Sequence, residues 1–368
     1  MRAGSVEPGG YPLPGPVPGL APVPEAAMHY APPRWLPGGN LQTIWPALCA
    51  RRVFGAPPRY RRERWTAPDG DFIDVDFLSE EAGAVVPGQP LLVLFHGLEG
   101  SSRSHYSEAF ADWAREHGLA YAVPHFRGCS GEINRAPRAY HSGDFEEVAW
   151  ILQRFRALQA RPGGGPLIAV GISLGGNALL RWAAEWGGAA QPPVDAVAAV
   201  CSPLDLAAGG QAIGRGFNRL VYTRMFLATM KPKALAKLRQ HPGLFDRERL
   251  LAVRDLYEFD NVFTAPLHGF ASTDDYWTRA SAKPHLARIR LPALVVNARN
   301  DPFVPATCLP RPPEVGDWVT LWQPEQGGHV GFAQGRLPGH VRSLPDVVGG
   351  WLLNALGAAV LSPAGARP

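Results

Sequence analysis

The stretch Gly171-Ile172-Ser173-Leu174-Gly175 constrains the fold more than any other part of the chain. It follows the apolar run 166–170, which is typical of a short buried strand, and it precedes a helical pattern over 176–185. A serine between glycines at a strand-to-helix turn predicts a nucleophile elbow. We expect glycine at 171 and 175 because a Cβ atom at either position would clash with neighbouring backbone. The turn lifts the Ser173 hydroxyl to the top of the sheet, beside amides that face a developing oxyanion.

Composition sets broad limits on the rest of the chain. Its 368 residues, 46% of them hydrophobic and 18% charged, are enough for a sizeable core in one large domain with an insertion, or in two domains. The net charge of +4 is small and dispersed, and no nucleic-acid motif accompanies it. Nucleic acid is therefore not an expected partner.

The cysteines give no sign of a disulfide framework or of a metal site. Cys49, Cys129, Cys201 and Cys308 form no C-x-x-C pair and have no zinc-type spacing. We therefore expect reduced thiols in a cytoplasmic protein, with Cys201 in the core because it ends an apolar run. Positions 1–34 lack the apolar region of a secretory signal, and no run of about 18 apolar residues predicts a membrane span.

The two ends of the chain read as tails. Proline alternates with other residues over 12–18, a pattern that suits neither a helix nor a paired strand. We predict a disordered proline-rich tail over 1–33, with a PxxP-type ligand as the alternative, and a loose tail over 359–368.

Between the tails, strand-like runs alternate with helical patterns, which predicts an α/β fold with a mostly parallel, doubly wound sheet. The runs 61–65 and 72–78 flank a turn signal and predict an antiparallel hairpin. The further predicted strands are 91–95, 119–124, 166–170, 194–200, 294–298 and 318–322, and the predicted helices are 104–117, 143–160, 176–185 and 338–357.

An insertion interrupts this alternation between the strands that end at 200 and begin near 292. It has little strand character, and the segments 211–230, 231–240 and 246–256 look helical. Such a segment is too long for a simple crossover. We therefore predict a helical lid over 203–290, between two parts of one core at 34–202 and 291–358.

Two further side chains complete a hypothesis for the site. Asp301 lies on the loop after the strand 294–298, and His329 lies on the loop after the strand 318–322. The order Ser, Asp, His suits a triad in which Ser173 attacks, His329 accepts its proton and Asp301 orients the imidazole. Glycines at 327, 328 and 331 are expected to leave room for the ring to approach the serine.

Two rivals for these roles remain open at this stage. Asp205 follows the strand that ends at 200 and is the alternative acid. His340 is a weaker alternative base because it begins a helical pattern. The hypothesis requires neither a cofactor nor a metal.

The oxyanion would be held by two backbone amides. A His-Gly loop follows the strand 91–95, and we assign the donors as the N–H groups of Leu98 and Leu174. The side chain of His96 is predicted to be a structural hydrogen-bonding group rather than a base.

The lid pattern has two interpretations. Tyr222, Phe226 and Met230 are spaced i, i+4, i+8, with Val221 and Met225 beside them. They could pack against the core like any apolar helix face. They could also form the wall of an acyl-chain site, because methionine and aromatic side chains adapt to flexible apolar ligands. Tyr222, Met225 and Phe226 are the candidate substrate contacts.

Five motifs together resemble the YheT-like family of α/β-hydrolases. They are residues 40–44 (NLQTI), 96–106 (HGLEGSSRSHY), 126–131 (FRGCSG), 140–144 (YHSGD) and 171–177 (GISLGGN). The resemblance spans about residues 34–357 and implies an α/β-hydrolase fold with a serine esterase or lipase-type activity. It also implies relatives that act on phospholipids or medium-chain acyl esters, and a triad of Ser173, Asp301 and His329. The proline-rich first thirty residues depart from the family pattern.

These observations favour a cofactor-independent carboxylesterase (EC 3.1.1) that acts on a small ester with a short or medium acyl chain. A peripheral contact with lipids and the oligomeric state are left open. Two alternatives use the same fold: acyl transfer from the same acyl-enzyme to an alcohol, and a binding protein without catalysis. Dehalogenase and epoxide-hydrolase chemistry is disfavoured because those elbows carry a carboxylate where Ser173 stands.

Overall fold

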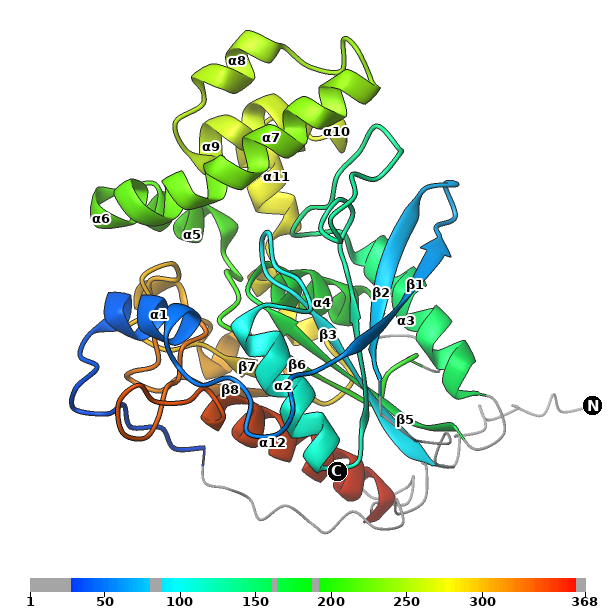
Figure 1. The fold of residues 1–368 in the computed structure, drawn as a ribbon, viewed down its shortest axis with the longest axis vertical. Coiled ribbons are helices and arrows are strands. Elements are labelled where there is room, and N and C mark those ends of the chain that lie inside the picture. The colour runs from blue at the N-terminus through cyan, green and yellow to red at the C-terminus, as the bar shows by residue number, and fades with distance from the viewer. Residues whose placement is uncertain (1–27, 80–87, 161–163, 187–191, 362–368) are drawn as a thin grey trace, which may run out of the picture.

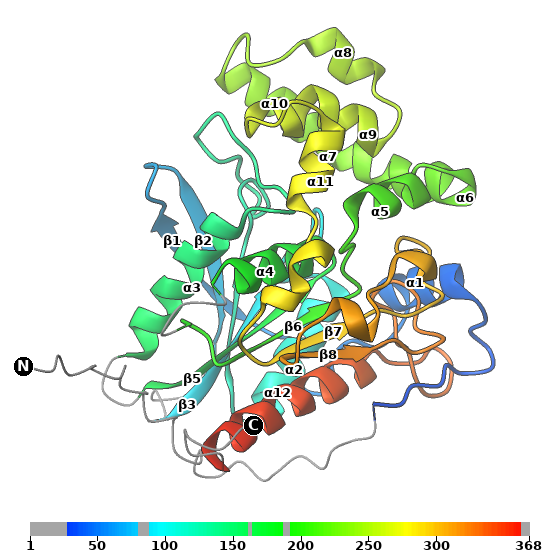
Figure 2. The same ribbon diagram turned by 180° about the vertical axis from the view of Figure 1, so that it is seen from behind.

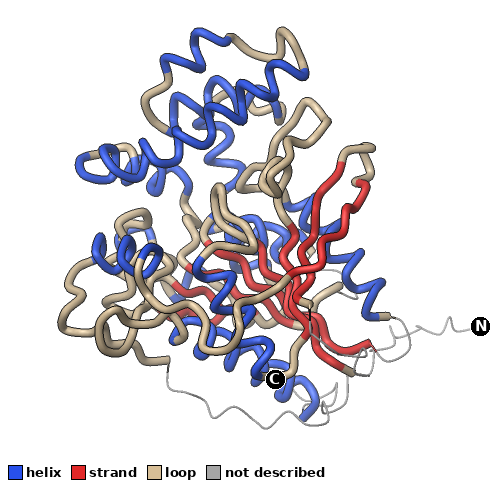
Figure 3. Tube along the Cα trace, viewed as in Figure 1, coloured by secondary structure: helices blue, strands red, loops and turns tan. Residues whose placement is uncertain are grey.

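A single eight-stranded sheet runs through the computed structural model, which describes residues 28–79, 88–160, 164–186 and 192–361 (Figure 3). The strand order is β1-β2-β4-β3-β5-β6-β7-β8. β1 and β2 form the predicted antiparallel hairpin, β2 is antiparallel to β4, and the six strands from β4 to β8 are parallel. The mostly parallel sheet is thus confirmed. The strands are β1 (Tyr60–Thr66), β2 (Phe72–Leu78), β3 (Gln89–Phe95), β4 (Ala120–Pro124), β5 (Gly164–Ile172), β6 (Ala196–Val200), β7 (Ala293–Val296) and β8 (Val319–Trp322).

The central strands are apolar on both faces because each face packs against helices. In β5, Leu167 and Ala169 enter one core while Ile168 and Val170 enter the other. The first core is closed by α3 (Phe145–Gln159) and α4 (Leu174–Glu185), and the second by α2 (His105–Glu116) and α12 (Ser343–Leu361) (Figures 1 and 2). Burial on both sides explains why these strands read as continuous apolar runs.

The segment predicted as the lid, residues 203–290, stands above one end of the sheet and contains no strand (Figure 1). Its start and end are joined at the base: the N–H of Leu206 donates to Ser281 Oγ at 2.9 Å, and the N–H of Lys283 donates to the carbonyl of Leu204 at 2.9 Å. Its helical elements are α5 (Leu206–Ile213), α6 (Gly216–Asn218), a π-helical turn (Arg219–Thr223), α7 (Arg224–Gln240), α8 (Arg247–Ala252), α9 (Leu256–Phe259), a second π-helical turn (Asp260–Thr264), α10 (Ala265–Leu267), α11 (Thr273–Ala280) and a 3₁₀ turn (Lys283–Arg288).

The boundaries of the predicted tails need correction where the structure describes them. Tyr30 is only 7% exposed, packs on Phe332 and donates its hydroxyl to the carbonyl of Ala333, so it belongs to the core. The last helix begins at Ser343 rather than 338, because Gly339 has a φ of 78°, outside the helical region. That helix continues to Leu361, so residues 359–361 are helical. The remaining tail predictions, over 1–27 and 362–368, lie outside the described residues.

A buried asparagine at the start of α4 ties the lid to the core. The Asn177 side-chain amide donates to the carbonyls of Ser142 and Ala280, both at 2.8 Å, and its carbonyl accepts from the N–H of Ala282 at 2.9 Å. It therefore joins the segment before α3, the end of α11 and the nucleophile helix. Loss of such a group leaves several buried polar atoms without partners.

We expect Asn177→Leu to lower the free energy of unfolding by about 3 kcal/mol, because buried donors and acceptors would lose their partners. Urea unfolding of the two proteins measures this difference. The matched control is Asn354→Leu on the partly exposed side of α12, where a change below about 0.5 kcal/mol is expected. Equal losses in both variants would contradict this account of Asn177.

Candidate active site

The predicted elbow is a strained turn between β5 and α4. Ser173 has φ 52° and ψ −117°, a conformation that side-chain-bearing residues rarely adopt. A Cβ atom at Gly171 would lie 2.5 Å from the Cα of Gly176, and one at Gly175 would lie 2.5 Å from the carbonyl oxygen of His96. Glycine at these two positions therefore lets the first turn of α4 sit against β5 and the end of β3.

The structure brings the three predicted side chains together at the carboxyl edge of the sheet. Ser173 Oγ lies 3.0 Å from His329 Nε2, and His329 Nδ1 lies 2.8 Å from Asp301 Oδ2. With Nδ1–H donating to the carboxylate, Nε2 is free to accept the serine proton. The other carboxylate oxygen of Asp301 accepts from the backbone N–H groups of Phe303 and Val304. Asp301 is 5% exposed, so these bonds fix a buried acid.

The loop that carries His329 rests on α1 (Gly39–Leu48), a helix that our sequence analysis did not connect with the site. The N–H of His329 donates to Thr43 Oγ1 at 2.9 Å, and the N–H of Gly327 donates to Gln42 Oε1 at 2.9 Å. A Cβ atom at Gly331 would lie 1.7 Å from the carbonyl oxygen of Gln42. The signal in the sequence was the motif at 40–44, which contains both α1 side chains.

The role predicted for the glycines near His329 was therefore wrong, because the space that they leave is not used by the imidazole. We predicted that Gly327, Gly328 and Gly331 leave room for the imidazole to approach Ser173. Instead, the space beside Gly328 and Gly331 is filled by Gln42, and that beside Gly327 by Phe332 and Ala298. The glycines admit α1 and a core aromatic ring rather than the serine.

The two amides assigned to the oxyanion lie beside Ser173 without an acceptor. Among the hydrogen bonds of the described residues, neither the Leu98 N–H nor the Leu174 N–H has a protein partner. Both residues line the same cavity as Ser173 and His329. Two unengaged donors at the start of α4 and in the neighbouring loop are what stabilisation of an oxyanion requires.

His96 supports this loop from below. It is fully buried; its Nδ1–H donates to the carbonyl of Gly97 at 2.8 Å, and its Nε2 accepts from the N–H of Phe126 at 3.0 Å. Burial lowers the pKa of His96 to about 3, so the ring is neutral. This arrangement agrees with a structural role.

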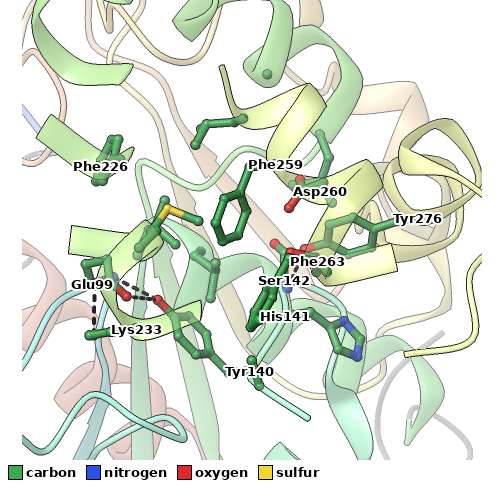
Figure 4. Close-up of a pocket in the computed structure, with 18 of the residues that line it drawn as sticks. Glu99, Tyr140, His141, Ser142, Phe226, Lys233, Phe259, Asp260, Phe263 and Tyr276 are labelled. Carbon is green, nitrogen blue, oxygen red and sulfur yellow. Dashed lines mark hydrogen bonds and ion pairs between the residues drawn. The ribbon is translucent and has the colours of Figure 1, made fainter. Parts of the chain in front are cut away.

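A lysine of the lid and a tyrosine of the core both contact Glu99, the residue that follows Leu98. Glu99 has a positive φ of 58°, and its N–H donates to the Tyr140 hydroxyl at 3.0 Å. That hydroxyl donates in turn to Glu99 Oε1 at 3.0 Å. Lys233 of α7 lies 2.8 Å from Glu99 Oε2 (Figure 4). The lid therefore contacts the oxyanion loop through an ion pair.

A cavity that is partly open to solvent extends from Ser173 and His329 into the lid. Its walls are mostly apolar, and Figure 4 shows Phe226, Phe259 and Phe263 around it. The carboxyl group of Asp260 lies among them, and Trp277 Nε1 donates to its Oδ2 at 2.9 Å. Burial raises the pKa of Asp260 to about 6. The cavity suits an apolar chain with few polar groups.

The structure corrects two of the three lid residues predicted to contact substrate. Phe226 lines the cavity, as does Met230, but Tyr222 and Met225 do not. Tyr222 is 3% exposed and donates its hydroxyl to Asn40 Oδ1 at 2.9 Å, whereas Met225 is 54% exposed. Met225 and Phe226 are consecutive residues of α7 and lie about 100° apart around the helix axis, so they face different sides. Tyr222 lies in the preceding π-helical turn.

The two rival site residues serve other purposes. Asp205 caps α5, with Oδ1 accepting from the N–H of Ala208 at 3.0 Å. His340 lies against the ring of Phe54, with ring centroids 5.2 Å apart. Neither residue lines the cavity around Ser173.

One group of side chains near the site has metal-ligand chemistry. The ligating atoms of Cys201, Asp301 and His329 lie within 4.8 Å of one another. Burial raises the pKa of the Cys201 thiol, however, and its sulfur accepts from the N–H of Val330 at 3.3 Å. A thiol that holds its proton is a poor ligand, and both ring nitrogens of His329 are already engaged. Asp301 and His329 therefore fit a proton relay with Ser173 better than a metal centre.

Comparison with known proteins establishes the family. The family model of the alpha/beta hydrolase fold matches residues 90–335. The chain is 39% identical over 335 residues to the Escherichia coli (strain K12) protein named "Putative esterase YheT", covering 90% of this chain and 95% of that protein. The chain belongs to the YheT-like α/β-hydrolases.

Other relatives of this YheT-like hydrolase are more distant. Phospholipase ABHD3 of Mus musculus is 28% identical, over 77% of this chain and 68% of that protein. Among solved structures, a puromycin-hydrolyzing peptidase of Mycobacterium tuberculosis shares the fold, with a TM-score of 0.51 and 18% identity over 86% of this chain and 43% of that one. The esterase and phospholipase relatives support hydrolysis of esters. Within the described residues, no helix combines the length and apolar character needed to cross a bilayer.

We expect Lys233→Met to lower kcat about tenfold with little change in KM, because the loop that carries Leu98 would lose its support. Lys233→Arg should restore most of kcat, since it keeps the ion pair with Glu99. Steady-state hydrolysis of p-nitrophenyl butyrate measures both constants.

The control for this prediction is Lys231→Met on the same helix. The Lys231 ammonium donates to the carbonyls of Leu251 and Val253, so its loss loosens the lid without touching Glu99. A similar fall in kcat in this variant would show that lid stability, and not the Glu99 contact, governs the rate.

Proposed function

We propose that the chain is a serine hydrolase that cleaves carboxylic esters through an acyl-enzyme on Ser173. The observation that carries the proposal is the continuous hydrogen-bonded relay from Ser173 Oγ through His329 to Asp301. Each residue follows a different parallel strand of one sheet, and each is held by backbone contacts. Such a preorganised relay is what activation of a weak nucleophile needs.

The first half of the reaction forms the acyl-enzyme. Ser173 Oγ attacks the ester carbonyl while His329 Nε2 takes its proton, and Asp301 stabilises the resulting imidazolium. The negative charge on the carbonyl oxygen is received by the N–H groups of Leu98 and Leu174. When the tetrahedral intermediate collapses, the alcohol leaves with the proton from His329.

The second half uses water in place of the alcohol. Neutral His329 takes a proton from water, which attacks the acyl carbonyl, and the same two amides hold the oxyanion. Collapse releases the carboxylic acid and returns the proton to Ser173. No electron transfer occurs at any step, and no group beyond these residues and water takes part.

The cavity supports an acyl chain as the part of the substrate that binds beneath the lid. Its apolar wall contains Phe226, Met230, Phe259 and Phe263, which would bury a short or medium aliphatic chain. The names of the relatives, an esterase and a phospholipase, are consistent with an ester or lipid substrate.

We expect Ser173→Ala to abolish hydrolysis of p-nitrophenyl butyrate, with a loss of at least about 10⁴-fold in kcat, because the nucleophile is removed. A fluorophosphonate probe should label the native protein at this serine, as located by peptide mass spectrometry. Ser272→Ala, at the cap of α11 in the lid, is the matched control and should keep both properties. Native-level hydrolysis by Ser173→Ala, or labelling at another residue, would refute the mechanism.

We expect Met230→Trp to shift preference toward shorter acyl chains, because a larger side chain would fill part of the cavity. Relative kcat/KM across p-nitrophenyl acetate, butyrate, hexanoate and octanoate measures the shift, which should reach about tenfold for the longest ester. Thr229→Trp, one position earlier on the exposed side of α7, should leave the profile unchanged. If both variants keep the native profile, the acyl chain does not bind beside Met230.

A further inference from the structure

The lid carries a strong charge bias that the proposed reaction does not use. Residues 206–245 contain no Asp or Glu, whereas the whole chain has 36 basic and 32 acidic residues. The Lys and Arg residues of this segment are Arg215, Arg219, Arg224, Lys231, Lys233, Lys237 and Arg239. A run this one-sided concentrates positive potential on one part of the surface.

The lysines of this segment have internal partners. Lys231 binds the carbonyls of Leu251 and Val253, Lys233 pairs with Glu99, and the buried Lys237 donates to the carbonyls of the 134–136 loop. These ammonium groups therefore stabilise the lid and its contacts with the core.

The arginines of this segment are not paired in this way, and three of the four lie between residues 215 and 224. Arg215, Arg219 and Arg224 are exposed, and no acidic side chain of the described chain pairs with them. Arg215 directly precedes α6, Arg219 begins the π-helical turn and Arg224 is the first residue of α7; these three elements form one continuous helical stretch. The positive charge of the three arginines is available to a partner.

Large apolar side chains alternate with these arginines. Phe217 is 51% exposed, Leu220 is 58% exposed and Met225 is 54% exposed. We define the lid patch as Arg215, Phe217, Arg219, Leu220, Arg224 and Met225. Grouped apolar side chains of this size are rare on the surface of a monomeric protein unless something binds there.

The neighbouring helix α1 also carries exposed apolar side chains. Its Leu41 is 49% exposed and its Leu48 is 74% exposed. The two helical stretches are joined directly, because the Tyr222 hydroxyl donates to Asn40 Oδ1, and Figures 1 and 2 show α1 and α6 on the same side of the molecule. Exposed apolar side chains therefore lie both on the lid and on the helix that supports the His329 loop.

We propose that the lid patch binds the surface of a membrane that contains anionic phospholipids. Helices that lie in a membrane interface combine arginine or lysine with exposed leucine and phenylalanine, and the patch has this composition. Arginine pairs with lipid phosphates and carboxylates, while Phe217, Leu220 and Met225 enter the headgroup boundary. The absence of any acidic residue from 206–245 removes the repulsion that such a surface would otherwise meet.

This orientation places the cavity next to the bilayer. Phe226 follows Met225 directly and lines the cavity, and Val221 packs with Ile44 of α1 on the cluster around Phe303, which is also a cavity wall. An apolar chain at the bilayer surface would therefore lie close to the lining of the site. Membrane binding goes beyond the proposed ester hydrolysis and is measured without turnover, so either can fail alone.

The test is sedimentation of the full-length protein with large vesicles of phosphatidylcholine, with and without phosphatidylglycerol. We expect binding to the anionic vesicles that weakens at high salt. The variant Arg219→Gln/Leu220→Ser should bind at least about tenfold more weakly, since each basic residue near an anionic surface contributes about fivefold. Circular dichroism and hydrolysis of soluble p-nitrophenyl butyrate show whether the variant is folded.

The matched control is Arg247→Gln/Leu251→Ser on α8. Arg247 and Leu251 are also an exposed basic and apolar pair of the lid, but Arg247 is paired with Glu248, and α8 stands apart from α6 in both views (Figures 1 and 2). The control should bind like the native protein. Equal binding to neutral and anionic vesicles, equal losses in both variants, or no binding would each overturn the proposal. A dimer that the Arg219/Leu220 variant dissociates, without vesicle binding, would assign the patch to a second copy of the chain and overturn it as well.

Discussion

The close packing of the α4 N-terminus against the ends of β5 and β3 is the constraint on which the site depends. At Gly175 the backbone approaches the carbonyls of Phe95 and His96 so closely that a single added carbon would lie 2.5 Å from each oxygen. This contact fixes the serine relative to the neighbouring loop. The Leu174 amide and the Leu98 amide, which come from α4 and from the loop after β3, can therefore face the same point.

A second set of contacts fixes the histidine. Gln42 accepts hydrogen bonds from Gly327 and from the Asn300 side chain, so one residue of α1 holds both the loop with the acid and the loop with the base. The imidazole is thus placed by polar contacts to backbone, whose geometry is more restrictive than apolar packing. α1 belongs to the site in this structural sense although none of its residues lines the cavity.

Much of the fold and of the candidate site could be predicted from the sequence because the relevant signals are local. Continuous apolar runs identify strands that are buried on both faces, and Asp301 and His329 each lie within a few residues of a strand end. The role of Gln42 could not be predicted, because its partners lie nearly three hundred residues away. The prediction for Met225 was wrong because Met225 is next to Phe226 in α7 and therefore lies about 100° away from it around the helix axis. The burial of Tyr30 was masked by the prolines that precede it.

The closed base of the lid has a consequence for how such proteins diversify. Because the segment leaves and re-enters the core through adjacent hydrogen bonds at Leu204, Leu206, Ser281 and Lys283, its ends are already held at a fixed separation. Helices between these anchors can be lengthened, shortened or exchanged without moving the strand ends that carry the serine, acid and histidine. Evolution can thus change what such an enzyme recognises while the reacting groups keep their positions.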